Sequence, residues 1–169
     1  MTAAQAASIT VDGINYTTSG AKATVAKYAI DKSVSPADSL FYKGDIVIPE
    51  KFTYEGTEYT VVATAAKCFE NCREITSITL PETCTNIARF SFTGCTALKI
   101  SPIPATATTI GSGVFKGCTN LEEVTIVPGW NKPISEEFSG CPNLKRLIIA
   151  DGPDPVEMKI NMFGNSSDA

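Results

Sequence analysis

A strictly spaced internal repeat restricts the possible folds of this chain more than any other feature. The segments FENC, FTGC, FKGC and FSGC begin at equal intervals, at Phe69, Phe92, Phe115 and Phe138. Their cysteines keep the same interval, at Cys72, Cys95, Cys118 and Cys141. A fifth copy, FGNS, begins two positions late, at Phe163. A period of roughly 20–50 residues is typical of solenoids, in which each coil, or rung, stacks on the next and equivalent residues form columns.

The residues between these segments have the properties that stacked coils need. Gly or Asn always precedes the cysteine position, and these residues most easily adopt the positive φ that ends a short helical turn. SITL, EVTI and RLII then alternate as short strands with one buried face do. We therefore predict an α/β solenoid of the leucine-rich-repeat layout, with one parallel sheet and short helical turns. The crossover rule for parallel strands makes it right-handed.

The segment LPETC, from Leu80 to Cys84, resembles a cell-wall sorting signal but takes its place in the repeat. Its counterparts in the next two rungs are IPATA and IVPGW, so it marks the exit from a strand, where proline ends the pairing. A sorting signal would also need an apolar C-terminal tail, which does not follow. Cys84 shares its column with Ala107 and Trp130, so we expect it in the core.

The first third of the chain lacks the period but is rich in strand signals. ITVDGINYTT and FTYEGTEYTVV predict hairpins around Asp12-Gly13 and Glu55-Gly56. IVIPE, beginning at Ile46, matches ITLPE, beginning at Ile78, so the first rung should begin there with the second hairpin inserted. We assign residues 1–62 to an N-terminal β cap with a leading hairpin, because a solenoid end exposes unpaired backbone. Residues 63–169 then form the solenoid, with about four rungs and a partial fifth.

Composition excludes several classes of function. The net charge is −4 and no basic cluster is present, which argues against binding to nucleic acid. No apolar run approaches the roughly 20 residues that cross a bilayer, so we expect no membrane insertion. The chain contains no histidine, which removes Ser-His-Asp and Cys-His nucleophile systems and most zinc catalysis. No cofactor or metal is expected.

The six cysteines allow three interpretations. Cys68, Cys84 and the four cysteines of the column all occupy positions for small buried residues, where a free thiol behaves as a small apolar group. Disulfides are the second possibility, but stacked rungs give parallel Cβ vectors and not the convergent ones that a bridge needs. A zinc site of Cys68, Cys72 and Cys84 would lack a fourth ligand. Buried thiols are the favoured interpretation.

Further side chains allow both a structural and a functional interpretation. The phenylalanine column is expected to be a stacked core and not an aromatic binding stripe. Trp130 lies in an inward column, although the repeat slips in phase at this point, and we favour its burial. Asp151 and Asp154 are too few ligands for a calcium site and fit a solvated turn better.

Two outward columns of the predicted strands are the candidate binding face, because solenoids commonly bind partners on their extended sheet. They consist of Ser77, Ile100, Glu123 and Arg146, and of Thr79, Pro102, Thr125 and Ile148. The same face has a purely structural interpretation. Glu123 lies opposite Arg146, and Lys99, Glu122 and Lys145 alternate in sign, which avoids like-charge pairs between rungs.

These repeats resemble the BspA-like, or treponemal-type, leucine-rich repeats. The resemblance rests on ITLPETCTNIARFSFTGCTAL, ISPIPATATTIGSGVFKGCTNLEEVTI and FSGCPNLKRLII, and it covers about residues 44–166. It implies a bacterial protein that is secreted or displayed at the cell surface, with an adhesin-like role in some members and no catalytic residues in the repeat. No signal peptide is visible at the start of the chain, and we expect it to have been removed.

The expected function is therefore non-enzymatic: an extracellular or cell-surface module that binds host or bacterial protein or glycan partners through the solenoid face. An intracellular protein-interaction scaffold is the alternative. A more distant one is a carbohydrate hydrolase that uses Glu122 and Glu123, or Glu136 and Glu137. The identity of the partner and the oligomeric state are left open by the sequence.

Overall fold

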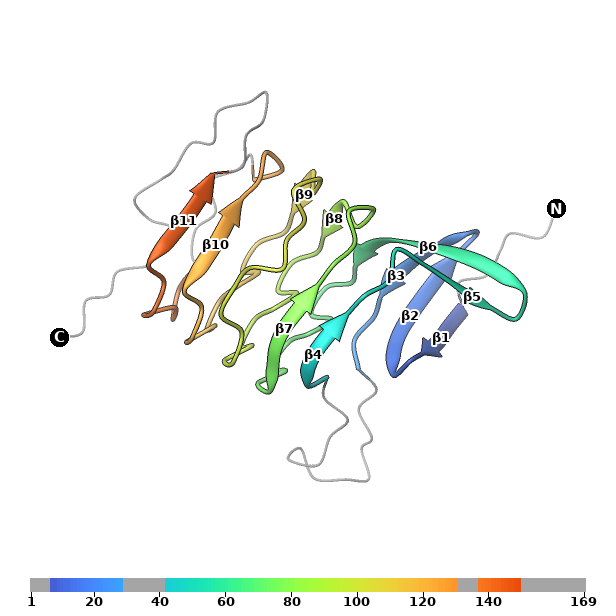
Figure 1. The fold of residues 1–169 in the computed structure, drawn as a ribbon, viewed down its shortest axis with the longest axis horizontal. Helices are drawn as coiled ribbons and strands as arrows, with labels where there is room; N and C mark the ends of the chain where they lie inside the picture. Colours follow the sequence, from blue (N-terminus) through green and yellow to red (C-terminus); the bar gives the residue numbers. More distant parts are fainter. Residues whose placement is uncertain (1–6, 29–41, 131–136, 150–169) are drawn as a thin grey trace.

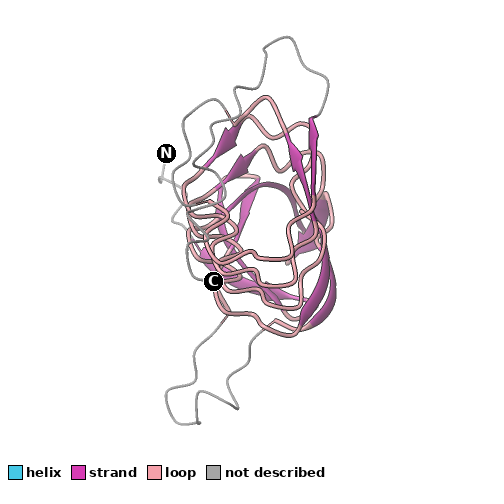
Figure 2. Ribbon diagram, turned by 90° about the vertical axis from the view of Figure 1, so that its left-hand side faces the viewer, coloured by secondary structure: helices cyan, strands magenta, loops and turns pink. Residues whose placement is uncertain are grey.

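The computed structural model of the chain describes residues 7–28, 42–130 and 137–149. Within these residues it consists of strands and turns, stacked into a solenoid (Figure 1). Seen along the stack, successive coils lie behind one another with strands on different sides (Figure 2). The eleven strands are β1 (Ala7–Val11), β2 (Ile14–Ser19), β3 (Lys22–Val25), β4 (Gly44–Val47), β5 (Lys51–Tyr54), β6 (Thr57–Thr64), β7 (Ile75–Thr79), β8 (Asn86–Ile87), β9 (Thr109–Ile110), β10 (Glu123–Ile126) and β11 (Arg146–Ile149).

The phenylalanine column forms the predicted stack at the centre of the core. Phe69, Phe92, Phe115 and Phe138 are all buried. Their ring centroids are separated by 5.6, 5.6 and 6.2 Å from rung to rung, with interplanar angles between 10° and 16°. Trp130 is also buried, as expected, with its ring 6.3 Å from that of Phe115. Phe163 lies outside the described residues.

Both predicted hairpins are confirmed. β1 and β2 pair in antiparallel orientation around Asp12 and Gly13, whose φ angles are 48° and 78°. β5 and β6 pair in the same way around Glu55 and Gly56, again with φ of 48° and 78°. Two successive residues with positive φ are what a type I′ turn requires, and this turn matches the twist of the flanking strands.

The predicted start of the first rung is confirmed as well. β4 pairs with β7 in parallel, with Ile46 opposite Ile78 and Val47 opposite Thr79. The β5–β6 hairpin is inserted between them. The N-terminal strands belong to another sheet: β3 pairs with β6 in parallel, and the complete order is β1-β2-β3-β6-β8-β9, with β5 also on β6.

The expectation of one parallel sheet is wrong for the described residues. β4–β7 and β10–β11 are separate two-stranded parallel sheets, and the rung between them, at residues 99–103, forms no strand (Figure 1). Pro102 and Pro104 explain the interruption, because a proline cannot donate a ladder hydrogen bond. What is left there is one isolated bridge, between Ile100 and Glu123. A second parallel ladder, β6-β8-β9, runs on another side of the coil.

The expected short helical turns are not confirmed, because the described residues contain no helix. Backbone donors in the turn of the first rung alternate between two kinds of acceptor. The N–H of Cys68 donates to Ala65 O three residues earlier, at 3.2 Å, and that of Cys72 donates to Phe69 O at 3.1 Å. The N–H groups of Phe69 and Asn71 instead donate to the next rung, at 2.9 and 2.8 Å. Half of these donors are thus taken by the neighbouring coil, and no continuous helical ladder can form.

The positive φ predicted at the end of each turn is confirmed. Asn71, Gly94, Gly117 and Gly140 have φ between 62° and 77°. A second left-handed position, unforeseen in the sequence, lies four residues earlier, at Lys67, Phe90 and Gly113, with φ of 64°, 59° and 66°. Each of these rungs therefore bends sharply twice. Within the described part of the chain no helix is long and apolar enough to span a membrane.

Candidate functional site

The outer face of β4, β7, β10 and β11 and of residues 99–103 between them is called the strand face below. It contains most of the side chains that the sequence assigned to binding. Ser77, Thr79 and Arg146 are exposed, and Glu123 and Thr125 are half-buried. Ile100 and Ile148 are 59% and 43% exposed, which is high for large apolar side chains. Pro102 differs from the others because it is buried. Within each column, residues of neighbouring rungs lie side by side, except where residues 99–103 interrupt the strand pairing.

Charged and polar groups on this face are paired between adjacent rungs. Arg146 donates to Glu123 across the β10–β11 ladder, and Lys145 Nζ lies 3.8 Å from Glu122 Oε2. At the other end of the face, Ser77 and Thr76 donate to Asp45 Oδ1 at 2.6 and 2.7 Å. The hydrogen bond from Ser77, followed by that from Thr76, lowers the pKa of the Asp45 carboxyl group. The predicted charge pairing is therefore present between Glu123 and Arg146 and between Glu122 and Lys145, whereas Lys99 makes no ion pair with a described residue.

A depression of about 600 Å³ lies on this face where the strands are interrupted. It is lined by Lys99, Ile100, Glu122, Glu123, Lys145 and Arg146. Three of these six residues, Lys99, Glu122 and Lys145, form the column of alternating charge. We had expected this column to have only a structural role. Asp45 and Val47 were missed altogether, although Val47 is 70% exposed. The match of Ile46 to Ile78 already placed them in the columns of Ser77 and Thr79, so that match was the available signal.

Of the second candidate carboxylate pair, only Glu137 is among the described residues. Glu137 is fully buried, and its carboxylate accepts hydrogen bonds from the backbone N–H groups of Gly113 and Val114, at 2.5 and 2.8 Å. Burial raises the pKa of Glu137 to about 7, although the two backbone hydrogen bonds oppose this. Glu136, Asp151 and Asp154 lie outside the described residues.

All six cysteines are buried and free. In the column, Cys95, Cys118 and Cys141 donate their thiol hydrogen to a phenylalanine carbonyl of the preceding rung, at 3.0–3.1 Å. Burial raises the pKa of Cys72 and Cys84 to about 12, so these thiols stay protonated. No cluster of three or more potential metal ligands occurs among the described residues. The cysteines are therefore core residues.

Alkylation provides a direct check on the thiols. We expect iodoacetamide to label all six cysteines when the protein is denatured without a reductant, because none is consumed in a bridge. The folded protein should react far more slowly, since the thiolate is the nucleophile and burial suppresses it. Mass spectrometry counts the labels. Fewer than six labels on the denatured chain would show that disulfides form.

Comparisons with known proteins agree with this geometry. The sequence model described as the BspA type leucine rich repeat region matches residues 46–168, in six copies. A leucine-rich repeat protein from Bacteroides ovatus is 27% identical, with a TM-score of 0.66 over 83% of this chain and 37% of that one. One from Bacteroides capillosus is 25% identical, with a TM-score of 0.67 over 85% of this chain and 99% of that one.

A third solved structure shows the same fold at lower identity. It is a leucine rich cell surface protein from Faecalibacterium prausnitzii, 22% identical, with a TM-score of 0.59 over 86% of this chain and 43% of that one. The chain thus spans less than half the length of two of these proteins. None of the curated proteins matches the chain.

Proposed function

This chain belongs to the family of BspA-type leucine-rich repeats, and from that membership we propose that it is a non-enzymatic cell-surface module that binds protein or glycan partners. The strand face is its binding surface. The observation that carries this proposal is the combination of large exposed apolar side chains and a charged depression on one face. Val47, Ile100 and Ile148 are the exposed apolar residues there. Exposed apolar groups beside charges are a feature of interaction surfaces.

The surface location and the adhesin-like role are further parts of the proposal. One neighbour that shares the fold is named as a cell surface protein, from Faecalibacterium prausnitzii. A stacked array of rungs suits display outside the cell, because its core is continuous and each rung adds to an extended face. At the cell surface, this extended face is accessible to partners on host tissue or on other bacteria.

The proposal that the module is not an enzyme is supported by the state of its carboxylates. Glu122 and Glu123 are each ion-paired with a cation of the next rung. A glycosidase needs one carboxyl group that stays protonated as a general acid and a second across the scissile bond. Both carboxylates are thus engaged in ion pairs between rungs, and neither is free to take one of these two roles.

Residues 1–62 are proposed to cap the solenoid, and residues 63–169 to form its repeating part. The contacts of Tyr42 support this division. Its ring lies 5.3 Å from that of Phe69, the first phenylalanine of the stack. Its hydroxyl group donates to Ala26 O at 3.1 Å and accepts from Asn15 N at 3.0 Å, which ties the stack to the N-terminal strands.

The binding function is tested by affinity capture. Immobilised protein is incubated with detergent extracts of host matrix and of bacterial surfaces, and the bound proteins and glycans are identified by mass spectrometry. A triple variant with Val47, Ile100 and Ile148 replaced by serine serves as the matched control, because these exposed residues contribute little to the core. We expect specific partners that the wild-type protein retains and the variant loses. Equal retention by both proteins would contradict the strand face as the binding surface.

A further inference from the structure

We infer that the depression on the strand face binds an extended acidic peptide with an apolar side chain between its acidic residues. This inference rests on the proposed binding function and adds the chemistry of the partner. The depression is lined by three cations, two carboxylates and Ile100. Nothing in the ordinary requirements of the repeat demands an exposed isoleucine at this position, since the same column holds Ser77, Glu123 and Arg146 in the other rungs.

The charges of the depression favour an anionic partner. Glu123 is largely covered, with a side-chain exposure of 17%, whereas its partner Arg146 is 72% exposed. Lys145 is 70% exposed and more open than Glu122, at 48%. Lys99 is exposed and makes no ion pair in the part of the chain that the structure describes. The cationic groups therefore reach solvent more than the carboxylates do, on a chain whose net charge is −4.

Ile100 provides the apolar part of the site. Ile100 follows Lys99 in the chain and pairs with Glu123, in the one bridge that residues 99–103 make with β10. The prolines of this rung prevent a regular ladder, so the isoleucine stands beside a break in the strand face. An apolar side chain of the partner can cover it and remove its surface from water.

The spacing of the cations suits an extended chain. Lys99 and Lys145 hold equivalent positions two rungs apart. Strands in a sheet are about 4.8 Å apart, so this separation is about 10 Å along the stack. Three residues of an extended peptide in the polyproline II conformation span a similar distance, about 9 Å, and bring residues i and i+3 to the same side. Acidic residues three positions apart therefore match the two lysines, and a leucine that follows one of them can reach Ile100, the chain neighbour of Lys99.

The test uses a fluorescein-labelled peptide with four repeats of Glu-Leu-Gly and measures fluorescence anisotropy with the full chain. We expect saturable binding that weakens when the salt concentration rises, because the contacts are exposed ion pairs. Lys99→Glu should weaken binding at least tenfold, since it replaces an attraction by a repulsion. Ile100→Ser should weaken it severalfold.

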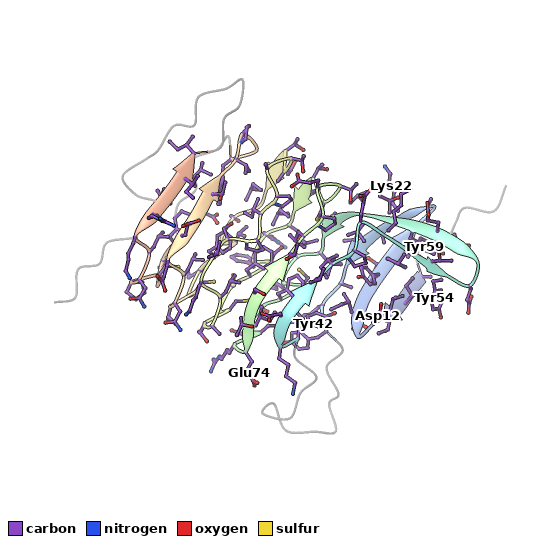
Figure 3. The ribbon with its side chains drawn as sticks, viewed as in Figure 1. Asp12, Lys22, Tyr42, Tyr54, Tyr59 and Glu74 are labelled. Carbon is purple, nitrogen blue, oxygen red and sulfur yellow. The ribbon has the colours of Figure 1, made fainter. Side chains whose placement is uncertain are left out.

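Lys22→Glu is the matched control, because it makes the same charge change on the N-terminal strands, away from the depression (Figure 3). Its affinity should stay within twofold of wild type. Thermal melting of each variant verifies that it is folded. The inference is overturned if the Glu-Leu-Gly peptide does not bind, if Lys99→Glu and Lys22→Glu act alike, or if a Lys-Leu-Gly peptide binds equally well.

Two further outcomes separate this site from the proposed function. If an oligosaccharide of uronic acids binds in a Lys99-dependent manner and the peptide does not bind, the ligand is an acidic glycan. The inference of an acidic peptide is then overturned. If the Lys99→Glu protein still captures the partners found in surface extracts, the binding function stands and the depression is not the site. Loss of those partners together with the peptide would support both.

Discussion

Replacing Phe115 by alanine is expected to lower the free energy of unfolding by about 3–5 kcal/mol. Phe115 is fully buried in the middle of the stack, with ring centroids of Phe92, Phe138 and Trp130 at 5.6, 6.2 and 6.3 Å. Truncation leaves a cavity that these rings cannot fill, because each is held by its own rung. Urea unfolding followed by circular dichroism measures the loss.

Phe90→Ala is the matched control for this prediction, since it removes the same atoms from a position outside the stack. Phe90 is only half-buried, with Lys67 Nζ 5.7 Å from its ring centroid. We expect a cost below about 1.5 kcal/mol, because a partly exposed ring loses less on truncation. Equal destabilisation by the two substitutions would show that the stack has no special role in stability.

Stability is expected to fall as the pH rises from about 4.5 to above 7, and Glu137 is the reason. Burial raises the pKa of Glu137 from 4.5 to about 7 in the folded protein. The folded state therefore holds the proton more tightly than the unfolded state does. The contribution of this group is fully present below pH 4.5 and is lost as the pH rises through 7. At about 1.4 kcal/mol for each pKa unit, the loss is about 3 kcal/mol.

Glu137→Gln isolates this effect, because glutamine does not titrate and keeps one acceptor for the two backbone donors. Asp45 has a lowered pKa, so its contribution is lost as the pH falls and has the opposite sign. That contribution is common to both proteins and cancels in the comparison. Urea unfolding at a series of pH values should show wild type losing stability relative to the variant between pH 4.5 and 8. A constant difference across this range would mean that Glu137 does not titrate.

The candidate site was only partly predictable from the sequence. The columns of Ser77 and Thr79 followed from strand alternation, and the pairing of Glu123 with Arg146 is confirmed. The depression was not foreseen, because it depends on how Pro102 turns into the core and leaves Ile100 outside. Strand alternation alone had placed both side chains on the outer face.

Glu137 shows the same limit. Its column contains Cys68, Ser91 and Val114, so its burial could be read from the period. The reason that a carboxylate is tolerated at this position could not be read from the period. The oxygens of Glu137 accept hydrogen bonds from two backbone N–H groups of the preceding rung. Only the packed coils bring those donors to it.

The sequence by itself determined the stack of phenylalanines, the buried cysteines, the left-handed residues before them, both hairpins and the start of the first rung. These features follow from the identity of residues at fixed spacing, because stacked coils place equivalent side chains in one column. The tertiary structure alone decided that the turns are not helical and that a second ladder forms through β8 and β9. In each case a backbone N–H has a choice between its own turn and the neighbouring coil, and that choice is made only when the coils lie against each other.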